Sequence, residues 1–132
     1  MHASPVFDVV SPGAALLAGG LFFAVFSLCT LLVETLALWL LKWGPFGRSL
    51  LAAFVMNLAS TMVGFVLVAF SFYAADFTAL YLVGFVLSVL IEGAILMLFK
   101  KGAARQNWIA SLVANVASYG LLAIAWLGLN LL

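Results

Sequence analysis

Four long apolar stretches dominate this chain and limit what it can fold into. They cover about residues 14–41, 49–73, 77–99 and 107–129. A helix needs ~20 apolar residues to cross a hydrocarbon core of ~30 Å, and each stretch is long enough. Because the bilayer core offers no water to backbone polar groups, such stretches are expected to be helical. The sequence therefore predicts an all-α membrane protein with four transmembrane helices.

The composition leaves little room for a soluble domain. The chain has 132 residues, of which 68% are hydrophobic and only 7% are charged, and its mean hydropathy is +1.35. Soluble domains carry about 25% charged residues. The net charge of +1 also provides no basic surface for nucleic acid. We therefore expect the lipid bilayer to be the main partner and expect no nucleic-acid partner.

The side chains that carry most enzyme chemistry are scarce. Cys29 is the only cysteine and His2 is the only histidine. This excludes disulfides within the chain, CxxC motifs, and catalytic sites that place a histidine beside a serine, a cysteine or a zinc ion. The sequence predicts a protein that is not an enzyme, with no catalytic residues, no metal site and no cofactor.

The basic residues fall into two clusters between apolar stretches. Lys42 and Arg48 flank the first turn, and Lys100, Lys101 and Arg105 flank the second. Under the positive-inside rule, these five residues form a cytoplasmic interface and both termini lie outside. The alanine- and leucine-rich composition is typical of bacteria. We therefore expect a multi-pass protein of the bacterial inner (cytoplasmic) membrane.

Aromatic residues mark the same boundaries. Trp43 and Trp108 lie beside the basic clusters, while Tyr73 and Tyr81 lie on either side of Asp76. Trp and Tyr are enriched where a helix leaves the membrane. These side chains are therefore expected at the two membrane–water interfaces.

A shift of 58 residues aligns one half of the chain with the other. Residues 34–60 then match residues 92–118 with ten identities in 27 positions. The rarer matches pair Glu34, Lys42, Gly44, Asn57 and Ser60 with Glu92, Lys100, Gly102, Asn115 and Ser118. This pattern predicts a tandem, parallel repeat of a two-helix hairpin, with hairpins 14–73 and 74–132 after an N-terminal extramembrane segment 1–13. The expected symmetry is a pseudo-two-fold axis along the membrane normal.

The acids and amides of the repeat should share one depth. Glu34 and Glu92 each precede a lysine by eight residues, and Asn57 and Asn115 follow an arginine by nine and ten. These spacings correspond to ~12–15 Å of helix, roughly half of the hydrocarbon core. The sequence therefore predicts a polar cluster at the membrane midplane, in which each Glu can bond to the Asn of its own hairpin: Glu34, Asn57, Ser60, Glu92, Asn115 and Ser118.

Small and polar residues recur at helical spacing in all four stretches. Helices in lipid pack through such faces, because no hydrophobic force drives them together. The four faces are expected to converge on one axis: Gly20, Ala24, Ser27, Thr30 and Glu34; Ala53, Asn57, Ser60 and Gly64; Gly84, Ser88 and Glu92; and Ser111, Asn115 and Ser118.

A charged carboxylate at the membrane centre costs at least ~2.5–3.5 kcal/mol. Glu34 and Glu92 should therefore be protonated, ion-bound or in contact with water, and two neighbouring carboxyls should not both ionise at neutral pH.

Two functions follow from these acids. As interhelical bonds they would serve a non-catalytic structural or accessory subunit, packed with other membrane subunits or in a homo-oligomer. The sequence favours this function. The alternative is a small proton- or ion-coupled transporter or channel with Glu34 and Glu92 at its centre.

Overall fold

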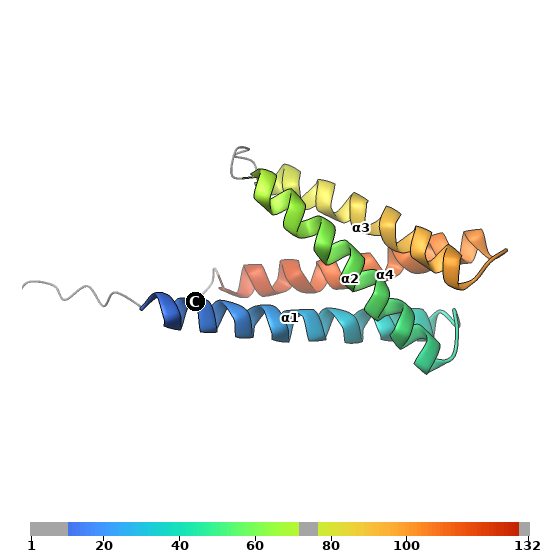
Figure 1. Cartoon of the computed structure of the whole chain (residues 1–132). Coiled ribbons are helices and arrows are strands. Elements are labelled where there is room, and N and C mark those ends of the chain that lie inside the picture. Colours follow the sequence, from blue (N-terminus) through green and yellow to red (C-terminus); the bar gives the residue numbers. More distant parts are fainter. Residues whose placement is uncertain (1–10, 72–76, 130–132) are drawn as a thin grey trace, which may run out of the picture.

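The chain forms four helices and no other regular element within the residues that the structure describes, which are 11–71 and 77–129. In this computed structural model, α1 covers Pro12–Leu40, α2 Phe46–Ser71, α3 Phe77–Phe99 and α4 Ala104–Leu129 (Figure 1). All four helices are long and apolar enough to cross a membrane. The prediction of an all-α protein with four membrane-spanning helices is therefore confirmed at this level, and the chain has the architecture of a multi-pass membrane protein. Most of the expected N-terminal segment, together with Tyr73 and Asp76, lies outside the described residues.

The second and fourth helices begin earlier than the apolar stretches do. α2 begins at Phe46 rather than near residue 49, and α4 at Ala104 rather than near residue 107. The first turns of these helices contain Arg48 and Arg105, because a long basic side chain can reach water while its backbone remains helical. Hydropathy locates the apolar part of a helix, and the helix itself starts about one turn before it.

Local signals fix both ends of α1. The hydroxyl of Ser11 accepts a hydrogen bond from the backbone N–H of Ala14 at 3.2 Å, and Pro12 occupies the first helical position, where no N–H is needed. At the other end Lys42 has a φ of 52°, a left-handed conformation that reverses the chain. Trp43 then donates from its backbone N–H to the carbonyl of Leu38 at 3.0 Å.

The four helices form a ring. The backbone of α1 packs against α2 and α4, and that of α3 against α2 and α4, whereas the backbones of diagonal helices do not approach each other within the described residues. The turns between α1 and α2 and between α3 and α4 lie at the same end of the bundle. Toward the opposite end, α2 and α3 diverge from α1 and α4 (Figure 1). The bundle is therefore tight at its turn end and wider at the other.

The core occupies the turn end. Leu38, Met56 and Leu96 are fully buried there beside the small residues Ala52, Ala53 and Ala110. Small side chains let helices approach closely, which is how helices gain packing energy in lipid.

The N-terminal half of α1 does not join this core. Residues 12–25 are all exposed, including Gly20 and Ala24 of the small-residue face. The expectation that this whole face converges on the bundle axis is wrong for these two residues. The cause is the divergence of the helices, which leaves only the part of the face from Ser27 onward against its neighbours.

Gly93 sets the distance between α3 and α4. A Cβ atom added at this residue would lie 2.3 Å from Cζ3 of Trp108 and 2.4 Å from its Cε3. The indole ring therefore packs directly on the α3 backbone, and only glycine fits at this position without displacing it.

We expect Gly93→Ala to destabilise the bundle by about 1–3 kcal/mol, because the added methyl group forces the Trp108 ring away from α3. The measurement is unfolding in mixed micelles with increasing SDS. Gly120→Ala on α4 is the matched control, since a Cβ atom there meets nothing within 4 Å. In a Trp108→Leu background the effect of Gly93→Ala should largely disappear. An equal effect in both backgrounds would contradict this account.

Candidate functional site

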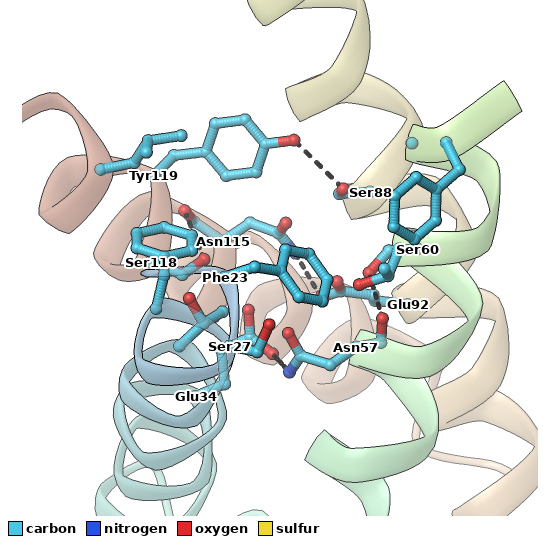
Figure 2. A pocket seen from close by; sticks show the side chains of 16 residues that line it. Phe23, Ser27, Glu34, Asn57, Ser60, Ser88, Glu92, Asn115, Ser118 and Tyr119 are labelled. Carbon is cyan, nitrogen blue, oxygen red and sulfur yellow. Dashed lines mark hydrogen bonds between the residues drawn. The ribbon is translucent and has the colours of Figure 1, made fainter. Parts of the chain in front are cut away.

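A pocket of about 300 Å³ lies between the four helices (Figure 2). Its lining residues on α1 run from Phe23 to Glu34, so the pocket extends from the acids away from the turns. The core at the turn end closes it on one side. The residues that line it come from every helix: Phe23, Phe26, Ser27, Thr30 and Glu34 of α1; Asn57, Ser60, Thr61, Gly64 and Phe65 of α2; Ser88 and Glu92 of α3; and Asn115, Ser118, Tyr119 and Leu122 of α4.

Each acid bonds to the asparagine of its own hairpin. Nδ2 of Asn57 donates to Oε2 of Glu34 at 2.5 Å, and Nδ2 of Asn115 donates to Oε2 of Glu92 at 2.6 Å (Figure 2). In both cases the partners are 23 residues apart. The acids are only 1% and 2% exposed, so these hydrogen bonds lie inside the bundle. The bonds expected from helical depth are present.

A second bond fixes each amide group. Nδ2 of Asn57 also donates to the backbone carbonyl of Ala53, and Nδ2 of Asn115 to that of Ser111, both at 3.0 Å. An amide nitrogen has two N–H groups, and both are used in each asparagine. The amide oxygen is therefore turned away from these partners.

Two buried oxygen atoms that belong to the pocket lining have no hydrogen-bond partner among the described residues. They are Oδ1 of Asn115 and Oγ1 of Thr30. Most buried polar atoms in proteins are paired, so a hydrogen-bond donor that reaches one of these oxygens from the pocket would be stabilised.

The two hairpins also meet through their acids. The side chain of Ser118 interacts with the carboxyl of Glu34, and that of Ser60 with the carboxyl of Glu92, while the two carboxyls interact electrostatically with each other. Each acid thus has one partner in its own hairpin and one in the other. All six residues of the predicted polar cluster line the pocket, and the structure brings them together.

Aromatic rings surround the wider end of the pocket. Phe23 of α1 lies with its ring centroid 5.8 Å from that of Phe65 of α2, and both side chains are about half exposed or more. Across the pocket, the Tyr119 ring packs against Phe85 at 5.2 Å, and its hydroxyl lies 3.3 Å from that of Ser88. The pocket therefore has a polar base and an apolar entrance.

The two turns are joined at the opposite end of the bundle. Nε1 of Trp43 donates to Oδ1 of Asn107 at 2.7 Å, and Nζ of Lys100 donates to the backbone carbonyl of Trp43 at 2.9 Å. Nη2 of Arg48 donates to the carbonyl of Phe99. We call Trp43, Asn107, Lys100 and Arg48 the turn cluster.

The side chain of Trp43 lies inside the protein, although the residue is beside the basic residues of the turn. It is only 2% exposed and its N–H is used within the bundle. The reason is the left-handed turn at Lys42, which carries the chain back over the core. Of the basic residues, Arg48 and Lys100 bond to the other hairpin, whereas Lys42, Lys101 and Arg105 are exposed at this end.

Sequence reasoning missed three buried polar residues. Thr35 donates to the carbonyl of Leu31 at 2.6 Å, and Ser49 and Asn107 are fully buried beneath the turns. Ser49 and Asn107 fall on each other in the 58-residue alignment. Two polar residues at one aligned position were a usable signal, although they are not identical.

The pocket offers two carboxyls and several hydrogen-bonding groups, and no basic side chain. Carboxyl, amide and hydroxyl oxygens line its base, and none of its lining residues is Lys, Arg or His. No group of three or more His, Cys, Asp and Glu that could hold a metal ion occurs within residues 11–71 and 77–129. Such a site can bind protons, cations and neutral hydrogen-bond donors.

Comparison with known proteins gives no relative: no family model, no curated protein and no solved structure matches this chain.

We expect Trp43→Phe to destabilise the protein by about 1–3 kcal/mol, because it leaves the buried Oδ1 of Asn107 without its donor. The measurement is SDS unfolding in mixed micelles. Trp39→Phe is the matched control, since this indole is 48% exposed on the outside of α1. Equal losses of stability in the two variants would show that the hydrogen bond contributes nothing specific.

Proposed function

We propose that this protein is a small proton- or ion-coupled membrane transporter or channel, with Glu34 and Glu92 as its central binding groups. One observation carries the proposal: two acids, buried in an apolar bundle, border a pocket that also holds an unpaired acceptor, Oδ1 of Asn115. Ionisable residues inside membrane helices are rare, and they commonly mark the path of an ion, a proton or a polar substrate.

Purely structural acids would leave a different arrangement. If the Glu–Asn bonds served only to hold helices together, packing should close around them, because an unpaired buried acceptor lowers stability by about 1–3 kcal/mol. An interhelical hydrogen bond in a membrane contributes only ~0.6 kcal/mol on average. A pocket whose lining includes Asn115 and Thr30, each with an unpaired oxygen, is therefore poorly explained by a structural role.

The two hairpins derive, in this proposal, from a tandem duplication. The support is the 58-residue alignment together with the equal spacing of the Glu–Asn bonds and the reciprocal contacts of Ser60 and Ser118. A parallel repeat places one acid from each copy on either side of a pseudo-two-fold axis. The solute would then bind on that axis.

The proposed orientation puts the turn cluster in the cytoplasm of a bacterium and the wider end of the pocket toward the outside. It rests on the five basic residues, all of which lie at the turn end. The core beneath the turns then separates the pocket from the cytoplasm, so the described conformation corresponds to an outward-facing state.

We expect Glu34→Gln combined with Glu92→Gln to abolish flux across liposome membranes while leaving the bundle intact. Glutamine can still accept the hydrogen bonds from Asn57 and Asn115, but it carries neither charge nor a transferable proton. The measurement is proton flux, followed with an enclosed pH-sensitive dye, and sodium or potassium flux with ion-sensitive dyes. Cys29→Ser, at an exposed residue of α1, is the control. Unchanged flux in the double variant would overturn the role of the acids.

An accessory subunit of a larger membrane complex is the second candidate, and a different observation favours it. Residues 12–25 of α1 are exposed and strongly apolar, with Leu17 and Leu21 among the most exposed large side chains. Such a surface suits another membrane subunit or a second copy as well as it suits lipid.

The second candidate predicts a stoichiometric partner. Native mass spectrometry of the protein, extracted from its own membranes, should then show one other chain at a fixed ratio. Leu17→Trp with Leu21→Trp should weaken that association, because both side chains lie on the exposed part of α1. Leu98→Trp, on exposed α3 surface, is the control. Detection of the chain alone or as a homodimer would exclude a hetero-oligomeric subunit.

A further inference from the structure

The base of the pocket selects for positive charge. Glu34 and Glu92 supply two carboxyls from opposite hairpins, and no lining residue carries a compensating positive charge. At low local dielectric, a cation beside an ionised carboxyl gains more than it would at the protein surface, and a bound cation in turn favours ionisation of these acids. A neutral solute gains none of this electrostatic stabilisation.

The base also selects for a ligand with N–H or O–H groups. Both N–H groups of Asn115 are held by Glu92 and Ser111, so its unpaired Oδ1 can only accept. Oγ1 of Thr30 is a second unpaired oxygen on the same lining. A cation without hydrogen-bond donors would leave this acceptor unsatisfied.

The size and entrance of the pocket select for an apolar body. Its volume of about 300 Å³ greatly exceeds the ≈ 30 Å³ that one water molecule occupies in the liquid, so a single inorganic ion would leave most of it empty. Phe23 and Phe65 meet at one side of the entrance and Tyr119 lies on α4. Aromatic rings stabilise both apolar groups and cations.

We propose that the pocket binds an amphipathic organic ammonium ion, whose N–H groups bond to Glu34, Glu92 and Oδ1 of Asn115 and whose apolar body lies against the Phe23–Phe65 pair. This inference rests on the proposed function, since both assign the solute site to the same acids. It adds the chemical class of the solute: a monovalent primary or secondary amine in its protonated form, with an aromatic or branched apolar part.

The test uses the full chain in nanodiscs and 2-phenylethylammonium chloride as the probe, with binding measured by isothermal titration calorimetry at neutral pH. Three analogues isolate the three requirements. Methylammonium lacks the apolar body, 2-phenylethanol lacks the charge, and trimethyl(2-phenylethyl)ammonium lacks N–H donors. Each analogue should bind about tenfold more weakly than the probe, or worse. Equal binding of 2-phenylethanol or of the trimethyl analogue would overturn the proposed ligand class.

Variants locate the site. Glu34→Gln with Glu92→Gln should weaken binding of 2-phenylethylammonium by about tenfold or more, because a charge-assisted hydrogen bond is replaced by a neutral one. Phe65→Leu should weaken binding of this probe several-fold and leave methylammonium unaffected. Phe54→Leu is the matched control on α2, since Phe54 is 53% exposed and does not line the pocket. Equal effects of the two phenylalanine variants would overturn the proposed placement of the apolar body.

Failure of this inference can be told apart from failure of the proposed function. Flux that depends on the acids, with no binding of 2-phenylethylammonium, would overturn the ligand class alone. Binding that depends on the acids, with no flux of protons, ions or the amine in liposomes, would overturn transport and retain the ligand class. SDS unfolding of each variant identifies any loss of binding that comes from misfolding, and the isosteric glutamine variants keep the test valid if a larger change unfolds the protein.

Discussion

The absence of water from the hydrocarbon core is the constraint on which this structure depends. A polar group placed there must find its partner within the protein. Asn57 and Asn115 meet this demand with bonds both to an acid on the neighbouring helix and to a carbonyl of their own helix. The acids complete the arrangement by contacts with serines of the other hairpin. The same side chains therefore join the helices and form the polar site.

The two ends of the bundle differ, because one is closely packed and the other holds the pocket. At the turn end, buried leucines, alanines and Trp43 hold the helices together, and the turn cluster ties one hairpin to the other. At the wider end, α2 and α3 move away from α1 and α4, and the pocket forms where packing stops. A tight end can hold four helices in fixed register while the other end stays accessible. This division would suit the proposed solute site, since the same four helices supply both its scaffold and its lining.

The sequence was most informative where a single physical rule decides the outcome. The lengths of the apolar stretches predicted the four helices. The number of residues from each basic cluster predicted that Glu34 lies at the depth of Asn57 and Glu92 at that of Asn115, and both pairs are hydrogen-bonded. It failed where several elements must be known together. The burial of Trp43 depends on a left-handed turn at a lysine, and the exposure of Gly20 depends on how far the helices diverge. Local sequence patterns predict neither the burial of Trp43 nor the exposure of Gly20. They show a tryptophan beside a lysine and a glycine at helical spacing, but not whether either residue is buried.

The anchoring of the asparagine amides has a consequence for recognition. Because Nδ2 of each asparagine is already bonded to the carbonyl four residues earlier, rotation about its side-chain torsions is largely frozen before anything enters the pocket. Ordering a side chain at a binding surface costs about 0.5–1.5 kcal/mol, and here that loss of entropy occurs during folding instead. The base of the pocket is thus preorganised, and for the proposed solute it would discriminate by the directions of the lone pairs that these helices hold in place.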